Sequence, residues 1–147
     1  MSAGAPTPGY SNSARLCVTA GPLAGPTICR VVSMLAGRAR CPLDRLDDAL
    51  LVCDAIIEHA PAHATDGRIS LEVAVDESSV ELRLGPLPAS VGDAILSEAA
   101  IPGIGNVLTQ VASRVSVQPT EGERELLVLV IDFESSQPSS GPVGLAG

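Results

Sequence analysis

The sequence predicts an α+β two-layer sandwich: a mainly antiparallel mixed sheet with helices on one face, in the order β-α-α-β-β-α-α-β-β. Two observations predict it. Alternating apolar and polar residues occur in two pairs of runs, each pair around a short polar turn, which is typical of an antiparallel hairpin with one buried face. Segments with apolar residues at helical spacing lie between the hairpins, and this mixture favours helices on one side of a single sheet.

The chain of 147 residues is long enough for one domain with a sizeable core and too short for two. Residues 1–12 and 134–147 are rich in Ser, Gly and Pro and cannot bury apolar surface, so we expect both to be disordered tails. The folded domain is therefore predicted to span residues 13–133.

The first half of the domain begins with a short strand over residues 15–20. Thr27 is expected to cap a helix that ends at Gly37, because apolar residues between them recur at helical spacing: Ile28, Val31, Val32 and Leu35. A second helix is expected to begin near 42–44 and to end at Pro61, since proline interrupts helical hydrogen bonding. Its acidic first turn suits the positive end of the helix dipole.

The second half follows the same logic, with turn residues between periodic segments. The expected elements are a hairpin over 68–75 and 80–84 around the turn 76–79, a helix over 91–100, a loop over 101–105, a helix over 106–113, and a second hairpin over 114–118 and 125–133.

Composition excludes several classes of function. All nine basic residues are Arg, so a P-loop lysine and a Schiff-base lysine are both excluded. The net charge of −8 and an aromatic content of 1% speak against a direct nucleic-acid binder, which needs a basic surface or stacking side chains. The apolar stretches are shorter than the roughly 20 residues of a membrane-spanning helix, and the first twelve residues lack the pattern of a signal peptide. We expect a cytoplasmic protein that does not contact a membrane.

Four cysteines are spaced evenly, twelve residues apart: Cys17, Cys29, Cys41 and Cys53. Zinc sites use closely spaced cysteine pairs, which are missing here, so we expect reduced, half-buried thiols. His59 and His63 have the spacing of a metal pair, but Pro61 lies between them and no HExxH motif is present. We therefore expect exposed histidines at a helix end and no metal site formed by them.

The second predicted helix carries a stripe of carboxylates. Asp54 and Glu58 are four residues apart and share a helical face, and Asp47 lies seven residues before Asp54 on the same stripe. One interpretation is a solvated acidic face. The other is a site in which one carboxylate activates a nucleophile while its neighbour holds a divalent cation.

This helix and the order of elements give the sequence a resemblance to a known family. Residues 14–133 resemble the histidine-kinase-like ATPase domain of bacterial anti-sigma factors, which are serine-protein kinases of partner-switching systems. The family carries a Glu and, four residues later, an Asn in a pattern like ExxxNAxxH, and Asp54 and Glu58 stand at those two positions. The resemblance implies Asp54 as the catalytic base, Glu58 as the magnesium ligand, and ATP with magnesium as cofactors.

Two segments depart from the family pattern, and a third resembles part of it. Asp54 is one methylene shorter than the family's Glu, and Glu58 adds a charge that Asn lacks. The segment 84–88, Leu-Gly-Pro-Leu-Pro, lacks the Asp that recognises adenine in the family. Gly103 and Gly105 precede a predicted helix and resemble the end of the family's phosphate-binding lid, although a tight loop entering a helix has the same pattern.

The resemblance also implies protein partners, either a sigma factor or an anti-anti-sigma protein, and a homodimer. Three arginines of the first helix and the turn after it would suit an acidic partner surface: Arg30, Arg38 and Arg40. Three hypotheses follow: a degenerate member that has kept the fold as a protein-binding module, an active ATP-dependent serine kinase, and a structural interaction domain without nucleotide. The lysine-free composition is typical of a GC-rich genome, such as that of an actinobacterium.

Overall fold

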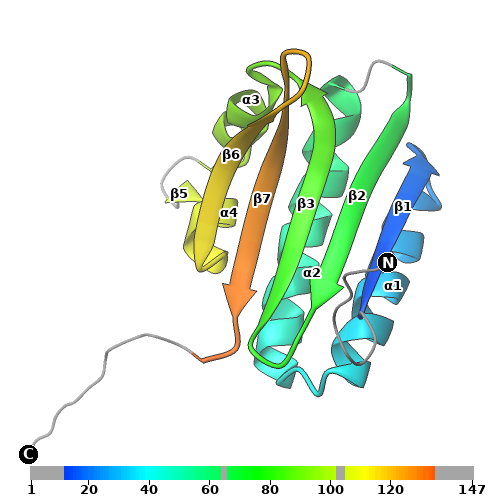
Figure 1. Ribbon diagram of the computed structural model, residues 1–147, viewed down its shortest axis with the longest axis vertical. Coiled ribbons are helices and arrows are strands. Elements are labelled where there is room, and N and C mark those ends of the chain that lie inside the picture. The colour runs from blue at the N-terminus through cyan, green and yellow to red at the C-terminus, as the bar shows by residue number, and fades with distance from the viewer. Residues whose placement is uncertain (1–11, 64–65, 102–104, 135–147) are drawn as a thin grey trace, which may run out of the picture.

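The computed structural model describes residues 12–63, 66–101 and 105–134. A five-stranded sheet forms one layer and four α-helices pack against one of its faces (Figure 1). The strands are β1 (Ser13–Thr19), β2 (Arg68–Val75), β3 (Ser79–Pro88), β6 (Arg114–Thr120) and β7 (Arg124–Asp132). The helices are α1 (Ala24–Arg38), α2 (Leu43–His59), α3 (Val91–Glu98) and α4 (Val107–Val111).

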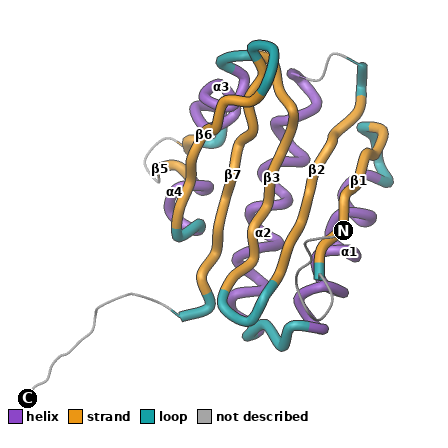
Figure 2. The backbone as a smooth tube through the Cα atoms, in the orientation of Figure 1, coloured by secondary structure: helices purple, strands orange, loops and turns teal. Residues whose placement is uncertain are grey.

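The predicted fold class is confirmed. The strand order across the sheet is β1-β2-β3-β7-β6, and every pairing in it is antiparallel. Both predicted hairpins are present, as β2–β3 and β6–β7, and all helices lie behind the sheet in the view of Figure 2. The opposite face of the sheet carries no helix within the described part of the chain, so the molecule has one open sheet face and one outer helical face.

The core between the layers is aliphatic. Alternate residues of the strands and one side of each helix are fully buried there, and no polar or charged residue is buried among those described. Its largest fully buried side chains include Ile28, Ile56, Leu82, Leu129 and Ile131. Burial of such side chains contributes about 25 cal/mol per Å² of apolar area, which lets a chain with almost no aromatic residues form a stable core.

The first helix begins earlier than predicted. Its N-cap is Leu23, and Thr27 lies inside the helix, where its hydroxyl donates a hydrogen bond to the Leu23 carbonyl at 2.7 Å. Pro26 is tolerated because it occupies the first turn, where backbone N–H groups have no partner within the helix. The expectation that Thr27 caps the helix was therefore wrong.

The end of α2 also differs from the prediction. The α-helix ends at His59, but a 3-10 turn over Ala60–His63 continues the helical path through Pro61. Proline fits the start of such a turn because its fixed φ is close to the helical value. As a result the chain carries His63 onward to the neighbourhood of α3.

Two further segments adjust the predicted boundaries. Residues within the expected loop 101–105 take part in a short antiparallel pair, β4 (Ala100–Ile101) with β5 (Gly105–Asn106). Strand β3 runs on to Pro88 and shifts its register against β7 at Gly85. Gly85 has a φ of +135°, and a Cβ there would lie 2.9 Å from the Glu125 carbonyl oxygen, so glycine is required.

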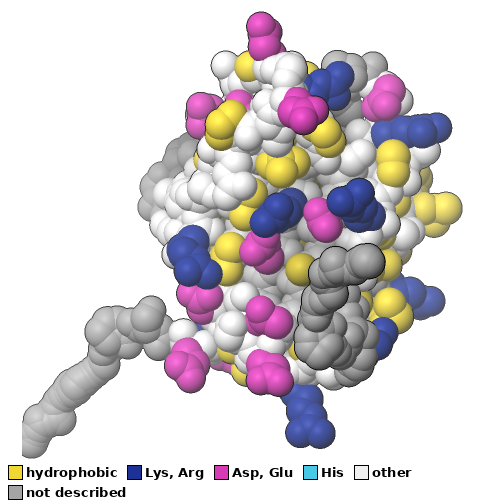
Figure 3. Space-filling model, in the orientation of Figure 1, with side chains coloured by type: hydrophobic (Ala, Val, Ile, Leu, Met, Phe, Trp, Pro, Cys, Tyr) yellow, Lys and Arg dark blue, Asp and Glu magenta, His cyan; other side chains and the backbone are white. Residues whose placement is uncertain are grey.

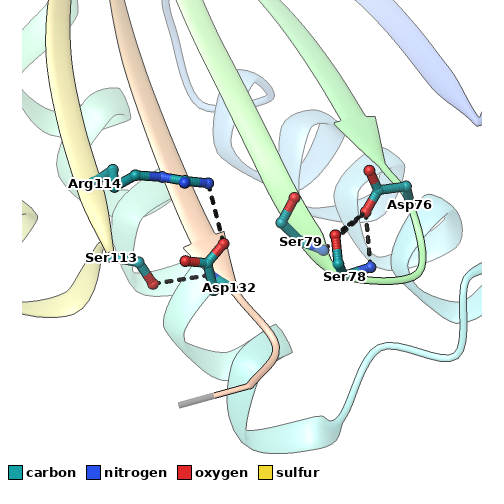
Figure 4. A network of polar contacts seen from close by, with 6 residues as sticks. All are labelled: Asp76, Ser78, Ser79, Ser113, Arg114 and Asp132. Carbon is teal, nitrogen blue, oxygen red and sulfur yellow. Dashed lines mark hydrogen bonds and ion pairs between the residues drawn. The ribbon is translucent and has the colours of Figure 1, made fainter. Parts of the chain in front are cut away.

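Short polar contacts hold the β2–β3 turn and the neighbouring end of β7 in place (Figure 4). The Asp76 carboxylate accepts hydrogen bonds from the Ser78 N–H at 2.7 Å and the Ser79 N–H at 2.9 Å, which fixes the β2–β3 turn. These hydrogen bonds lower the pKa of Asp76, with the Ser78 N–H making the largest contribution.

Among the helices that the structure describes, none is a candidate for crossing a membrane.

Candidate functional site

The acidic stripe of α2 lies on the outer side of the helical layer. Buried residues of α2 face the sheet, whereas Asp47, Asp54 and Glu58 are all exposed. Among the described residues, no hydrogen bond or ion pair involves Glu58. The stripe that the sequence predicts is therefore present, with its carboxylates turned toward solvent and away from the core.

Asp54 faces the neighbouring helix. Its Oδ1 lies 4.0 Å from the Sγ of Cys29 in α1, a distance at the outer limit for a thiol hydrogen bond. Burial and then the nearby Asp54 carboxylate raise the pKa of the Cys29 thiol. Burial likewise raises the pKa of Cys53, on the core side of α2, to about 12. Both thiols are therefore protonated at neutral pH, and protonated thiols are poor nucleophiles and poor metal ligands.

The four thiols differ in depth. Cys17 is exposed on β1, Cys29 and Cys41 are partly buried, and Cys53 is buried in the core. The prediction of half-buried thiols holds for the middle two and is wrong for the outer and inner ones, because sequence spacing does not specify which face of an element each residue occupies.

The segment at the adenine-binding position is part of a strand. Leu87 of β3 pairs with Glu125 of β7, so the Glu125 carboxylate lies beside this segment on the neighbouring strand. Its Oε2 accepts a hydrogen bond of 2.8 Å from the Gly92 N–H in the first turn of α3. The carboxylate therefore caps a helix N-terminus and complements its dipole, and it is not free to receive a base.

The glycines of the lid-like segment separate into two cases. Gly103 lies outside the described residues. Gly105 is exposed, with a φ of +105°, and a Cβ there would collide with the Gln110 side chain. The following Asn106 is the N-cap of α4, and its side chain accepts hydrogen bonds from Leu108 N at 2.9 Å and Thr109 N at 3.2 Å. The amides that would cradle a phosphate at this helix are thus bound by Asn106.

His59 and His63 both lie near the carboxylate of Glu98, a residue of α3. The spacing of the two histidines in the sequence did not predict this contact. The Nε2 of His63 lies 3.0 Å from Oε2 of Glu98, and the Nδ1 of His59 lies 3.9 Å from its Oε1. Each histidine side chain is 21% exposed, so the expectation of exposed histidines was wrong: the 3-10 turn folds them onto α3. Within the described part of the chain, no group of three or more His, Cys, Asp or Glu residues has the arrangement of a metal site.

The three arginines named from the sequence occupy different surroundings. Arg30 is exposed on the outer side of α1, and Arg40 is exposed in the turn between α1 and α2 with a φ of +59°. Arg38, at the end of α1, lines a hollow of about 580 Å³ together with acidic residues of the β2–β3 hairpin: Asp76, Glu77 and Glu81. Of the three arginines, Arg38 alone lines this hollow.

A second hollow, of about 490 Å³, lies on the open sheet face over a row of small residues: Cys17, Ser70 and Gly85. Arg15, Glu72 and Arg83 border it. Asp54, Glu58 and Gly105 line neither this hollow nor the one beside Arg38.

Comparison with known proteins adds no family assignment. No protein-family model matches the chain. A search of curated proteins finds no match either. The functional argument therefore depends on the fold and on the surfaces described here.

One surface was missed in the sequence. The large apolar side chains that are exposed in the described residues all lie on α1, α2 or their first turns: Leu23, Met34, Leu43 and Leu51. Their spacing on the sequence was detectable, but periodicity alone assigns an apolar residue to the core face, and only the structure shows which ones lie outside it.

Proposed function

We propose that this chain is an anti-sigma-factor-like regulatory protein, in which a degenerate histidine-kinase-like ATPase fold serves as a protein-binding module in partner-switching control of transcription. The support for the fold is the antiparallel sheet with four helices on one face. The support for the protein-binding role is the surface chemistry of the helical layer, where apolar side chains and unpaired charges are exposed together.

One observation carries the proposal that ATP chemistry is lost. The segments that would hold nucleotide by resemblance are used by this chain for its own structure or face open solvent. Asn106 binds the amides of α4, the segment around Gly85 and Leu87 is a paired strand, and Glu58 stands exposed on α2. Phosphate binding at a helix needs free N–H groups, and a magnesium site needs converging oxygen ligands.

The proposed partner is a sigma factor or an anti-anti-sigma protein, and the proposed contact surface includes α1. Arg30 is the natural centre of that contact because it is exposed and, among the described residues, forms no ion pair. An exposed guanidinium can bind a partner carboxylate with two parallel hydrogen bonds, which gives both affinity and geometric selectivity.

Calorimetric titration tests the loss of ATP chemistry. The full chain is titrated with ATP and with ADP, each with and without magnesium, and the measurement is repeated on Asp54→Ala and Glu58→Ala. We expect no heat of binding for any of the three proteins. Magnesium-dependent binding of nucleotide that both substitutions abolish would contradict the proposed loss of ATP binding and would favour an active serine kinase.

Partner binding is tested separately. Sigma factors and anti-anti-sigma proteins from the same genome are passed one by one over the immobilised full chain. We expect one of them to bind, and to bind at least tenfold more weakly to Arg30→Glu, because the substitution puts like charges in contact. Arg124→Glu, an exposed arginine on β7, is the matched control and should leave binding unchanged. Binding by none of these proteins would contradict the proposed function.

A further inference from the structure

Two of the four cysteines lie on the two helices that pack side by side behind the sheet, α1 and α2 (Figure 1). Cys29 belongs to α1 and Cys53 to α2, and both are free thiols. Cys29 is partly buried, whereas Cys53 is fully buried in the core. The two residues are 24 positions apart in the sequence, so any contact between them is a product of the fold.

Contacts between α1 and α2 show which residues face each other. A Cβ on Gly25 would lie 3.6 Å from the Ile57 side chain, and the Cys29 Sγ lies 4.0 Å from the Asp54 Oδ1. The residue number falls on α2 as it rises on α1, so the two helices are antiparallel. Cys29 follows Gly25 by about one helical turn, and Cys53 precedes Ile57 by about one turn. The next level of the helix contact therefore places Cys29 opposite Cys53.

The electrostatics of Cys53 give a second sign of this proximity. Burial is the main reason that the pKa of Cys53 is raised to about 12, and repulsion from a Cys29 thiolate comes next, ahead of the Asp54 carboxylate. Charges on two sulfur atoms influence each other in this way only when the atoms are close together in the protein interior.

The packing of the two helices is compatible with a bond between the two sulfur atoms. Packed helix axes lie about 9 Å apart and Cα atoms lie about 2.3 Å from each axis, so Cα atoms that face each other are about 4 to 7 Å apart. Two cysteines can be bridged when their Cα atoms are about 4.4 to 6.8 Å apart. A disulfide across this contact therefore needs no rearrangement of the helices.

The other two cysteines are too far away to compete for Cys29. Cys17 lies on the open sheet face, where its Sγ accepts a hydrogen bond of 3.7 Å from the Ser70 hydroxyl, so the sheet separates it from the helices. Cys41 follows the C-terminal end of α1, which is about 14 Å along the helix from Cys29. The fold therefore offers Cys29 a single thiol partner.

We propose that Cys29 and Cys53 are a redox-sensitive pair, in which oxidation forms a disulfide that links α1 to α2 and reduction breaks it. The structure described above is the reduced form. In the oxidised form the first helix can no longer separate from the second. This inference requires neither nucleotide nor a partner protein, so it stands independently of the proposed function.

The disulfide forms by exchange with a low-molecular-weight disulfide. Cys29 is the more exposed member of the pair, so it loses its proton to solvent and its thiolate attacks one sulfur atom of the small disulfide. A mixed disulfide forms and one small thiolate leaves. Cys53 then loses its proton, its sulfur attacks the Cys29 Sγ, and the second small thiolate leaves. Both small thiolates take up protons, so two protein thiols are oxidised and one small disulfide is reduced to two thiols.

Burial makes this reaction slow. Desolvation, followed by the Asp54 carboxylate, raises the pKa of Cys29, and the pKa of Cys53 is raised to about 12. Thiolates are the reacting species, and few of them exist in this pair at neutral pH. We expect oxidation to take on the order of hours, so the pair responds to lasting oxidation and not to a brief pulse.

A variant of the full chain that keeps only this pair tests the inference. Cys17→Ser/Cys41→Ser is incubated in the folded state with oxidised glutathione for a day. We expect both remaining thiols to be lost with no glutathione retained, and dithiothreitol to restore them. Trypsin digestion without reductant should give peptide 16–30 linked to peptide 46–68. Cys17 must be replaced because it lies on the same tryptic peptide as Cys29.

A matched control removes the partly buried member of the pair and leaves the core unchanged. Cys17→Ser/Cys29→Ser also has two thiols, Cys41 and Cys53. We expect it to form no link under the same conditions, because no second thiol lies within reach of Cys53. Circular dichroism before and after incubation verifies that both variants are folded.

Urea denaturation tests whether the link fits the native fold. The disulfide closes a loop between α1 and α2 and so restricts the unfolded chain. The oxidised form of Cys17→Ser/Cys41→Ser should therefore have a urea midpoint higher than that of its reduced form by on the order of 1 M.

Three results would overturn the inference. The first is a folded Cys17→Ser/Cys41→Ser chain that keeps both thiols, or that holds glutathione on Cys29 without forming the link. The second is an equal yield of linked peptides from Cys17→Ser/Cys29→Ser, because Cys53 would then pair with Cys41. The third is a linked chain that unfolds at a lower urea concentration than the reduced chain, which would mean that the fold does not hold the two sulfur atoms within bonding reach.

Discussion

The open sheet face and the outer helical face are the two broad surfaces of the sandwich, and they manage charge in opposite ways. On the open sheet face the two signs alternate in space, as the interleaved blue and magenta side chains of Figure 3 show. Arg15, Glu72 and Arg83 lie directly opposite one another on three adjacent strands, so each cation has an anion beside it. On the outer helical face, Arg30 lies on α1 and Asp47 and Glu58 lie on α2, and among the described residues none of these three forms an ion pair.

The two faces also differ in how they treat apolar residues. Val128 and Val130 of β7 are only 5% and 8% exposed, yet both lie outside the core cluster and on the open side of the sheet. In register with them are longer charged side chains, Arg83 beside Val128 and Glu81 beside Val130. Long charged side chains can cover apolar surface while their ends stay in water. The sheet face therefore covers its own apolar residues, whereas the outer helical face leaves Leu23 and its neighbours open.

This difference shows that an exposed surface indicates a binding role when its charges are unpaired and its apolar side chains are uncovered. A face whose charges are paired and whose valines are covered is stable in water without a partner. Exposed apolar side chains next to unpaired charges are the usual composition of a binding surface. The following changes test whether the two faces differ as described.

The largest effect is expected in the core that both faces share. Ile56→Ala removes a fully buried side chain of α2 that packs against the sheet. The lost burial and the remaining cavity should lower the free energy of unfolding by about 3 kcal/mol. Urea denaturation followed by circular dichroism measures it. An effect below about 1 kcal/mol would mean that the layers are not packed together at this position.

The same substitution on each face should give different results. Val128→Glu forces a carboxylate into a covered position and should lower the free energy of unfolding by about 2 kcal/mol. Met34→Glu changes an exposed position and should alter the stability of the monomer by at most about 0.5 kcal/mol. Urea denaturation at low protein concentration measures both. Equal losses would contradict the comparison.

The turn at the end of the sheet face gives a smaller, pH-dependent effect. Asp76→Ala removes the acceptor of the Ser78 and Ser79 N–H groups and should cost about 1 kcal/mol at pH 7. Because hydrogen bonding lowers the pKa of Asp76 in the folded state below its ordinary value of 3.8, its contribution is present above that pH. It is lost as the pH falls through the lowered value.

The wild-type and Asp76→Ala stabilities should therefore converge in acid. Denaturation curves of both proteins at neutral pH and near pH 3 measure the convergence. A difference that stays constant with pH would mean that the carboxylate charge plays no part in holding the turn.

The smallest effect is expected for the ion pairs of the sheet face. The Arg15 Nε lies 3.7 Å from the Glu72 carboxylate, and the Arg15 side chain is largely exposed. A double-mutant cycle with Arg15→Gln and Glu72→Gln should give a coupling energy of at most about 0.5 kcal/mol, decreasing with added salt. A coupling above about 1 kcal/mol would indicate a rigid, partly desolvated network on this face.

Much of the fold was predictable because its signals are local. The alternation on either side of Asp76 and the helical spacing around Ile28 are short-range patterns, so both hairpins are present and the first helix contains the residues that predicted it. The expected helix start at Thr27 was wrong for a local reason as well, and the α-helix that ends before Pro61 is continued by a 3-10 turn that was not predicted. A polar residue and a proline each have two allowed roles near a helix end, and only packing selects between them.

The candidate site was less predictable because its geometry is not local. The sequence places Asp54 and Glu58 on one helical face but does not show whether that face meets another group. The contact of His63 with Glu98 joins residues 35 apart in the sequence through two helices. Capping of α4 by Asn106 could have been inferred, since asparagine before a helix commonly accepts the first amides.

The four cysteines are buried to different degrees, so the rates at which their thiols react report which part of the molecule unfolds locally. A small alkylating reagent should modify Cys17 on the sheet face in the native protein, because that thiol is exposed. Cys53 is buried with a pKa raised to about 12, so its alkylation should require global unfolding. Cys29 within α1 and Cys41 after it are partly buried and should react between these limits. Mass spectrometry of the alkylated chain over time would then show the order in which these thiols become accessible, with no cysteine introduced by mutation.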